Sequence, residues 1–344
     1  MAAYKLQDLP SEWAHFCLGV HKFVQKETDI TLEGQKVLLA FSGGSDSTAL
    51  LRILHFLAPG LNFEVSAAHV HHSLRPEAEQ ERVRAGELCT SLNIPLISCR
   101  IDVRTFSRRK KKGLEESSRL LRYRYLCSAA RRVGADYILT GHSLNDLAED
   151  IIMRMQRGSG WPALAGMQAY VPGLKLLRPL LFTSKREILK FLNVLGQGYV
   201  LDRSNLDPAF LRSRIRMIVV PELESINPGF LKNMATLWKL GREDERYWED
   251  ILSQIWQNLP EDKDLLPMDV LIKAPRAVRL RLYKKMLESL GPGQALAENI
   301  IELDALWVQK KTNAQIQFPG NKLGRITRQG IEFQIRSRVK GLKD

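Results

Sequence analysis

The fold is decided by the stretch Val37-Leu38-Leu39-Ala40-Phe41-Ser42-Gly43-Gly44-Ser45-Asp46-Ser47-Thr48-Ala49-Leu50-Leu51, in which an apolar run ends in a polar loop and a helical pattern follows at once. This order predicts a buried strand, Val37–Phe41, that turns sharply into a helix, Ser47–Phe56. Gly43 and Gly44 permit unusual backbone angles and let a ligand approach the main chain closely. The unpaired N–H groups and the positive dipole end at a helix start attract anions. The stretch therefore predicts a nucleotide site.

Asp46 is an unexpected residue in a phosphate-binding loop, because its carboxylate repels phosphate. It fits such a loop if it holds Mg²⁺ or a water bound to that metal. Further hydrogen-bond donors are the hydroxyl groups of Ser42, Ser45, Ser47 and Thr48. The loop matches neither the Walker A pattern nor the dinucleotide Gly-x-Gly-x-x-Gly pattern. The alternative is a tight strand–helix turn with a capping serine or aspartate.

Length and composition indicate a basic protein of two or three domains. The chain has 344 residues, 44% of them hydrophobic, and a net charge of +13, which favours a polyanionic partner such as nucleic acid. The four cysteines form no Cys-x-x-Cys pair, which argues against a zinc ribbon or an iron–sulfur site. There is no N-terminal signal pattern and no run of roughly 20 apolar residues. We therefore expect a soluble cytoplasmic protein that has no membrane contact.

Apolar runs alternate with helical patterns up to about residue 155. This alternation predicts an α/β fold, a doubly wound parallel sheet of the Rossmann-like kind. The other expected strands are 63–70, 95–101 and 136–140, and the other expected helices are 11–26, 77–92, 114–133 and 144–155. Residues 158–179 are expected to form a loop, followed by a helix at 184–195. Ligands bind at the carboxyl ends of parallel strands, so the loops after residues 41, 70 and 140 matter most.

The pattern changes near residue 225. A turn at 202–205 and a basic helix at 208–217 lead into helices at 228–252, 276–290 and 295–307, and short strands are expected at 314–318, 324–327 and 331–335. We therefore divide the chain into an α/β domain, 1–225, and a mostly helical domain with a short β tail, 226–344.

Histidines follow the second expected strand. His69 and His71 share a face of that strand, and no third ligand of a suitable type is obvious, so zinc is not favoured. Beside a nucleotide loop, His69 is expected to contact base, ribose or phosphate. Capping of the strand end explains these histidines equally well.

Two groups of cations come next. The run Arg108, Arg109, Lys110, Lys111 and Lys112 lies in an expected loop and is either a solvated surface or a contact for a phosphate backbone; the net charge favours nucleic acid. Arg119 and Arg122 are three residues apart on an expected helix and so share a face. Two guanidinium groups aimed at one point suit a triphosphate or a leaving pyrophosphate. Ordinary surface arginines are the alternative.

A third polar group follows the fourth expected strand. His142 lies at a strand–helix junction, and Asp146 and Glu149 follow one turn apart. A histidine near carboxylates can steer protons or orient a metal and a nucleophile. A capped helix with acids near its positive end is the alternative. Arg157 ends this helix in a cationic turn, which suits a phosphate but is equally a plain helix stop.

The order of these motifs resembles that of the tRNA(Ile)-lysidine synthetases, which belong to the N-type ATP pyrophosphatase, or PP-loop, superfamily. The motifs that carry the resemblance are Ser42–Ser47, His69–Arg75, Glu115–Tyr123, Gly141–Glu149, Arg157–Gly160, Asp202–Asn205, Phe210–Arg216, Pro221–Leu223 and Ile226–Pro228. They cover about the first 230 residues. The chain departs from the family pattern at Asn145, where an acid is usual, at Ser213, where Asn is common, and at Ser45.

The resemblance implies an ATP-dependent carbon–nitrogen ligase. Such an enzyme joins free L-lysine to C2 of the wobble cytidine of tRNA(Ile) with a CAU anticodon, through an adenylated tRNA intermediate, and releases AMP and pyrophosphate. Residues 1–225 would form the PP-loop domain with tRNA-facing loops, and residues 226–344 a tRNA-binding domain. The alternatives are another PP-loop tRNA-modifying enzyme, such as a thiolase, and a nucleotide- or RNA-binding protein without turnover. The oligomeric state is left open, with a homodimer as one option.

The resemblance also implies roles for single residues. The implied catalytic residues are Asp46, Arg119, Arg122, His142 and Asp146, with Asp46 as the Mg²⁺ ligand. The implied ATP-binding residues are Ser42, Gly43, Gly44, Ser45, Asp46, Ser47 and His69. The implied tRNA contacts are Arg108, Arg109, Lys110, Lys111, Lys112, Arg157, Arg212, Arg214 and Arg216.

Overall fold

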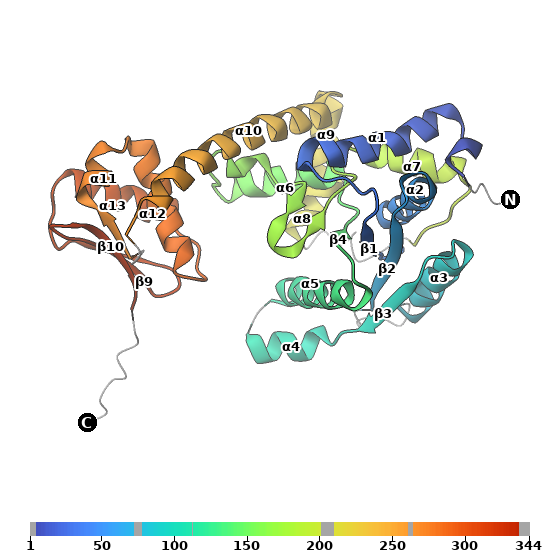
Figure 1. Ribbon diagram of the computed structural model, residues 1–344, viewed down its shortest axis with the longest axis horizontal. Helices are drawn as coiled ribbons and strands as arrows, with labels where there is room; N and C mark the ends of the chain where they lie inside the picture. Colours follow the sequence, from blue (N-terminus) through green and yellow to red (C-terminus); the bar gives the residue numbers. More distant parts are fainter. Residues whose placement is uncertain (1–4, 72–77, 112, 201–209, 261–263, 337–344) are drawn as a thin grey trace. The chain divides into compact units, whose positions relative to one another are not determined.

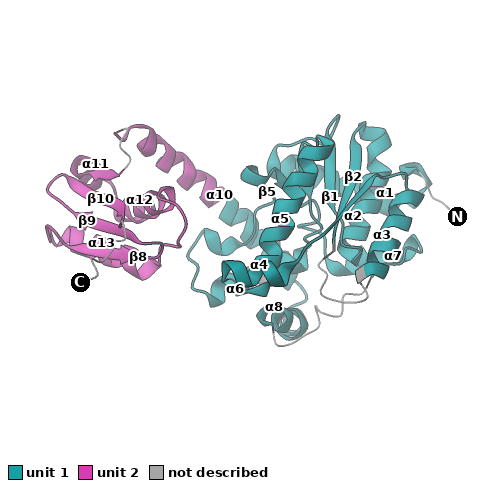
Figure 2. Cartoon of the chain, turned by 90° about the horizontal axis from the view of Figure 1, so that it is seen from below, with its two compact units in different colours: residues 1–242 teal, residues 243–344 magenta. Residues whose placement is uncertain are grey.

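The computed structural model describes residues 5–71, 78–111, 113–200, 210–260 and 264–336. The chain forms two compact units, Met1–Arg242 and Glu243–Asp344, which Figure 2 shows in different colours. The expected boundary near residue 225 lies inside the first unit. The long helix α10, Phe230–Gln257, begins in the first unit and ends in the second. Within the described residues, no helix is both long enough and apolar enough to cross a membrane.

A six-stranded sheet forms the centre of the first unit (Figure 1). Its strand order is β3 (Leu96–Arg100), β2 (Glu64–His71), β1 (Lys36–Ala40), β4 (Tyr137–Leu139), β6 (Leu176–Leu177) and β5 (Tyr170–Val171). All paired strands run parallel except β5, which runs antiparallel to β6. The chain order reverses beside β1, which confirms the predicted doubly wound α/β class.

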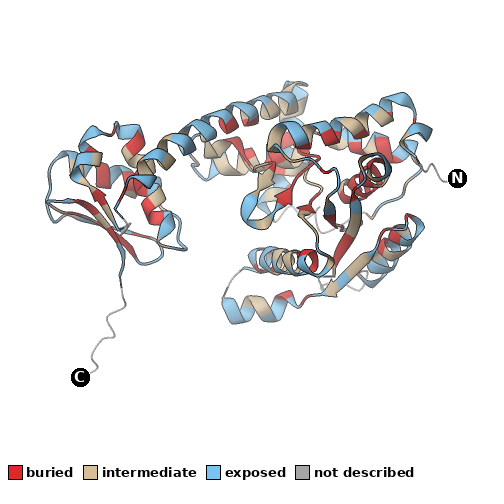
Figure 3. Ribbon diagram, viewed as in Figure 1, coloured by how far each residue is buried: buried red, intermediate tan, exposed pale blue. Residues whose placement is uncertain are grey.

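Helices cover both faces of this sheet. They are α1 (Ser11–Thr28), α2 (Ser45–Leu61), α3 (Ala78–Ser91), α4 (Val103–Lys110), α5 (Leu114–Val133), α6 (Leu144–Gln156) and α7 (Lys185–Val194). Val37 and Leu39 of β1 pack into the core beneath α1, α2 and α7, whereas Leu38 packs with residues of α5 on the other face. Because both faces are buried (Figure 3), the strand is a continuous apolar run instead of an alternating one.

Two of the expected loops are wrong. The basic run at 108–112 is not simply a loop, because Arg108 to Lys110 form the last turn of α4. The Asp102 side chain caps this helix by accepting from the Thr105 amide, and cations are favourable at a helix C-terminus. The expected loop at 158–179 contains β5 and β6. These strands of two residues each are too short to produce a recognisable alternation. β6 is buried between β4 and β5, whereas β5 is a partly buried edge strand.

The segment from residue 210 onward also differs in detail from the expectation. The basic helix expected at 208–217 consists of α8 (Leu211–Arg214), a π-helical turn η5 (Ile215–Val219) and α9 (Val220–Ile226). The turn expected at 202–205 lies outside the described residues.

The second unit combines helices with a small antiparallel sheet. Its further elements are β7 (Leu265–Pro267), α11 (Met268–Lys273), α12 (Arg276–Ser289), α13 (Ala297–Val308), β8 (Gln315–Phe318), β9 (Lys322–Ile326) and β10 (Gly330–Ile335). The sheet order is β7-β10-β9-β8. The expected helices and the β tail are confirmed, and β7 and α11 are additions.

Candidate functional site

Hydrogen bonds from its own hydroxyl groups fix the conformation of the loop between β1 and α2. Gly43 has a φ of +80°, a left-handed conformation that glycine adopts without strain. The Ser47 hydroxyl accepts from the Ser42 amide at 3.3 Å and donates to the Gly44 carbonyl at 3.0 Å. The Thr48 hydroxyl donates to the Gly43 carbonyl at 3.1 Å. These bonds fix the curve of the loop around the start of α2, where an anion binds best.

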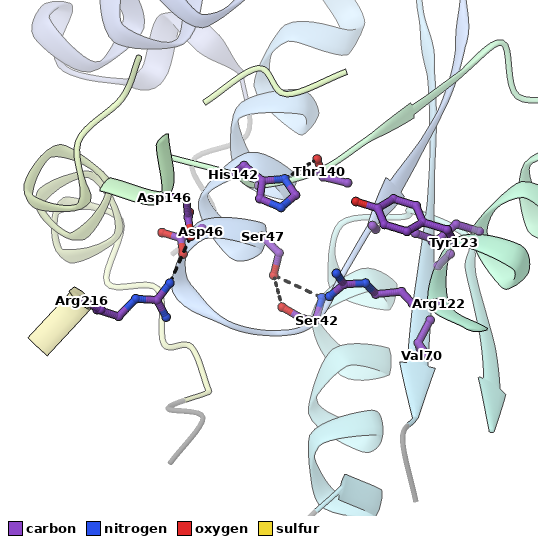
Figure 4. Close-up of a pocket in the computed structure, with 14 residues that line it drawn as sticks. Ser42, Asp46, Ser47, Val70, Arg122, Tyr123, Thr140, His142, Asp146 and Arg216 are labelled. Atoms are coloured by element: carbon purple, nitrogen blue, oxygen red, sulfur yellow. Dashed lines mark hydrogen bonds and ion pairs between the residues drawn. The ribbon is translucent and has the colours of Figure 1, made fainter. Parts of the chain in front are cut away.

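A cavity of about 230 Å³ lies at the carboxyl ends of β1, β2 and β4 (Figure 4). It is lined by Ala40, Ser42, Asp46, Ser47, Ala68, Val70, Arg122, Tyr123, Leu126, Thr140, Gly141, His142, Asp146 and Arg216. The loop therefore shares one cavity with four of the charged or titratable residues expected from the sequence. A Cβ added to Gly141 would lie 3.0 Å from the Asp46 carbonyl carbon, so only glycine lets this strand end approach α2 so closely.

Lys185 is a cation of this site that sequence reasoning missed. Its ammonium group, at the start of α7, lies 2.7 and 2.8 Å from the two carboxylate oxygens of Asp46 and 2.6 Å from the Ser45 hydroxyl. Burial is the main influence on Asp46 and raises its pKa, while the charge of Lys185 acts to lower it. Asp46 is therefore a carboxylate that already balances a cation at the mouth of the loop.

The position of Lys185 depends on Asn145, one of the departures from the family pattern. The Asn145 side-chain oxygen accepts from the Lys185 backbone amide at 2.8 Å. Ser184 and Glu187 form a capping box that starts α7 at this residue. The capping pattern could have predicted the helix start, but no local pattern predicts that Lys185 reaches a loop 139 residues earlier in the chain.

Four charged groups form an ion-pair cluster at one wall of the cavity, which two of them line. Arg212 and Arg216, from α8 and η5, both contact Asp146 and Glu149 of α6 at 2.6–3.1 Å. The Glu149 side chain is only 2% exposed. Burial acts to raise the pKa of Asp146, but Arg212, Arg216 and the Ser143 amide outweigh it and hold that pKa below its ordinary value. The cluster keeps Asp146 ionised and ties α8 and η5 to α6.

His142 is held in a neutral form. Its Nδ1 is hydrogen-bonded to the Thr140 hydroxyl at 2.8 Å, as Figure 4 shows. Burial and the nearby charges of Arg178, Arg212 and Arg122 lower its pKa, and these effects outweigh the opposing charge of Asp146. A neutral imidazole here can hydrogen-bond to a substrate without adding to the positive charge around it.

Arg119 and Arg122 do not converge on one point. Arg122 lines the cavity, but Arg119 lines a neighbouring one, and Tyr123 separates them. The Arg119 and Arg122 guanidinium carbons lie 5.1 and 5.6 Å from the centre of the Tyr123 ring. Residues three apart share a helix face only to within about 60°, which is enough for their side chains to line two different cavities.

His69 also lies elsewhere than expected. Ala68 and Val70 line the cavity, and His69, between them on β2, faces the other side of the sheet because side chains alternate along a strand. Its Nδ1 donates to the Phe41 carbonyl at 3.0 Å. This bond supports the strand end that precedes the loop.

The other expected nucleic-acid contacts divide into two groups. Arg108, Arg109, Lys110, Lys111, Arg157 and Arg214 are exposed. Arg212 and Arg216 instead face the carboxylates of α6. Lys112 lies outside the described residues.

The fold and the site define an ATP-binding protein of the PP-loop class. The family model described as PP-loop domain matches residues 16–223. The chain is 39% identical to the tRNA(Ile)-lysidine synthase of Nitratidesulfovibrio vulgaris over 315 residues, which cover 86% of this chain and 91% of that protein. We conclude that the chain belongs to the tRNA(Ile)-lysidine synthase family.

Other relatives agree. The tRNA(Ile)-lysidine synthases of Geobacter sulfurreducens and Dehalococcoides mccartyi are 34% and 30% identical over 79% and 80% of this chain, which spans 59% and 60% of their lengths. Among solved structures, the U34-tRNA thiolase NcsA of Methanococcus maripaludis matches with a TM-score of 0.53 and 18% identity, over 65% of this chain and 78% of that one. This likeness supports the fold alone.

Proposed function

We propose that this chain joins L-lysine to C2 of the wobble cytidine of tRNA(Ile) with a CAU anticodon. The C2 oxygen attacks the α-phosphorus of ATP, the bond to the β-phosphate breaks, and pyrophosphate leaves. The lysine ε-amine then attacks C2, the C2–oxygen bond breaks, AMP leaves with that oxygen, and the amine loses a proton. The observation that carries the proposal is the convergence of the loop, Arg122 and two carboxylates on one cavity in a chain of this family.

The loop Ser42–Ser47 would bind the pyrophosphate part of ATP. The amides at the start of α2 supply donors, and the dipole of this helix favours the growing negative charge of the leaving group. Arg122 and Lys185 add positive charge on two sides of the loop. Once ATP is bound and Lys185 has moved from Asp46 to a phosphate, cations already in place lower the barrier because they need no rearrangement when the bond breaks.

The carboxylates of the cavity fit a magnesium ion that arrives with ATP. Mg²⁺ is usually held by one or two carboxylates together with substrate phosphates and waters. Asp46 and Asp146 both line the cavity. The described residues include no group of three or more His, Cys, Asp or Glu side chains suited to a metal, so phosphate oxygens would complete its ligands. When bound, the ion would neutralise charge on the phosphates.

His142 is assigned to substrate positioning. Its lowered pKa makes it a weak base near neutral pH, so abstraction of a proton from the lysine ammonium is not its role. As a neutral group beside the cavity, it can hold the polar edge of a base by a hydrogen bond. The exposed cations of α4, with Arg157 and Arg214, are assigned to the phosphate backbone of the tRNA.

The test is a reaction with ATP, lysine and tRNA(Ile) transcript. We expect AMP and pyrophosphate in equal amounts, and a cytidine whose mass rises by one lysine less one water when the nucleosides are analysed. Omission of lysine should stop the reaction at the adenylated tRNA. Release of ADP, or a sulfur-containing nucleoside when a sulfur donor is supplied, would contradict the proposal. Pyrophosphate release also separates it from a binding protein without turnover.

A further inference from the structure

A second cavity, of about 640 Å³, shares Tyr123 with the first one. Its walls are Glu116, Arg119, Leu120, Tyr123, Arg124, Cys127, Arg131, Val171, Leu174 and Arg178. One wall is a face of α5, and the other comes from the β5–β6 region, so both belong to the first unit. We call it the Arg178 cavity. The proposed reaction takes place in the first cavity and assigns no function to the Arg178 cavity.

The Arg178 cavity is rich in arginine. Arg119, Arg124, Arg131 and Arg178 contribute four guanidinium groups, while Glu116 is the single carboxylate among the described lining residues. Arg178 is only 6% exposed, and its Nε is buried with no hydrogen-bond partner among the described residues. Its Nη1 donates to the Gln168 carbonyl. Burial dominates and lowers the pKa of Arg178, although the Tyr123 hydroxyl and the charge of Asp150 also stabilise the cation. A buried cation whose hydrogen bonds are incomplete is costly, and an anion in the cavity would relieve that cost.

The remaining walls are apolar and partly aromatic. Leu120, Tyr123, Val171 and Leu174 present hydrocarbon and ring surface, and Leu120 is 39% exposed. The Arg119 guanidinium lies over the Tyr123 ring. Flat apolar walls with cations beside them match a heteroaromatic base attached to a phosphate, because bases stack on aromatic rings and arginine planes while arginine binds phosphate. The volume is within the usual range for a small-ligand pocket.

We propose that the Arg178 cavity binds the nucleotide adjacent to the one that is modified, with its base against Tyr123 and Leu120 and its phosphate near Arg119 and Arg178. This inference rests on the proposed function, since a cytidine in the first cavity would place its neighbouring nucleotide close to Tyr123, which lines both cavities. Enzymes that act on a base in a single strand commonly hold flanking nucleotides to position the target. A free mononucleotide also combines a base with a phosphate and would suit the same cavity. The test below distinguishes it from a nucleotide of the tRNA.

The test measures binding of an RNA stem-loop with a CAU anticodon, by fluorescence anisotropy at fixed salt. Arg119→Gln should weaken this binding about tenfold, because a stacked or phosphate-bound arginine contributes on that scale. Arg178→Gln should weaken binding to the same extent if this variant folds. If it does not fold, Arg119→Gln still tests the proposal, because Arg119 is exposed and its substitution should leave the fold intact. The matched control is Arg132→Gln, an exposed arginine of α5 that is not among the residues lining either cavity. It should bind like the wild type.

A stem-loop with an abasic nucleotide next to the target cytidine completes a double-mutant cycle. The missing base should weaken wild-type binding about tenfold and cause no further loss in Arg119→Gln. Equal losses in both proteins would place that base elsewhere and overturn the inference. Weakened ATP binding with unchanged RNA binding would assign the cavity to a free nucleotide and also overturn it. If the wild type binds the stem-loop but forms no adenylate, the proposed function fails separately.

Discussion

Asp46→Asn is expected to lower the rate of pyrophosphate release about 10²–10³-fold, the effect typical for loss of one preorganised electrostatic group. The carboxylate faces Lys185 and lines the cavity at the mouth of the loop. The asparagine has the same size, so the loop hydrogen bonds between Ser42, Gly44 and Ser47 should persist. The loss therefore concerns charge, because a neutral amide holds Mg²⁺ weakly and leaves the Lys185 ammonium without its counter-charge.

The measurement is single-turnover pyrophosphate release with saturating ATP and tRNA, together with tRNA affinity in the absence of ATP. Affinity for tRNA should stay within about twofold of the wild type, because Asp46 makes no contact with the exposed cations assigned to RNA. Asp102→Asn is the matched control, since Asp102 is an exposed aspartate that caps α4. Turnover of Asp46→Asn near the wild-type rate would show that this carboxylate does not hold the metal.

Glu149→Ala is expected to destabilise the first unit by about 3 kcal/mol, the lower end of the range measured when one partner of a buried ion pair is removed. Glu149 accepts three hydrogen bonds from Arg212 and Arg216, and its loss leaves Asp146 as the carboxylate that both cations contact directly. The two arginine side chains are 32% and 37% exposed, so water offsets part of the cost. Because Arg216 lines the cavity, activity should fall as well.

Urea unfolding followed by circular dichroism measures this effect, with the transition of each unit fitted separately. Glu222→Ala, at an exposed glutamate in the first turn of α9, should change stability by less than about 0.5 kcal/mol. Glu149→Gln should lie between the control and Glu149→Ala, since the amide keeps one acceptor. An unchanged midpoint for Glu149→Ala would mean that the cluster does not hold η5 against α6.

The central strand and its loop could be predicted because their signals are local. A strand buried on both faces is a continuous apolar run, and the two glycines, the hydroxyl residues and the helical pattern all lie within fifteen consecutive residues. The short strands β5 and β6 gave no such signal, since each has only two residues and β6 owes its burial in part to β4, which lies far away in sequence. The end of α4 was missed because a run of cations is typical of loops, whereas the Asp102 cap favours a helix.

The candidate site could be predicted only in part, because contacts between distant elements decide which side chains meet. Arg122, His142, Asp146 and the loop come together as expected. Helical spacing could not reveal that Tyr123 separates Arg119 from Arg122. The spacing along the strand also did not determine on which face of the sheet the His69 side chain lies. Lys185 gave no local signal, since its contact with Asp46 depends on how α7 packs beside α2.

The most direct test of the central claim is a crystal structure with a non-hydrolysable ATP analogue and Mn²⁺ in place of Mg²⁺, with the metal located by its anomalous signal. We predict that the β- and γ-phosphates lie on the amides of the loop at the start of α2 and that Asp46 binds the metal, with Lys185 moved from that carboxylate to a phosphate. A nucleotide bound elsewhere, with the Lys185–Asp46 pair intact and no metal at Asp46, would contradict it.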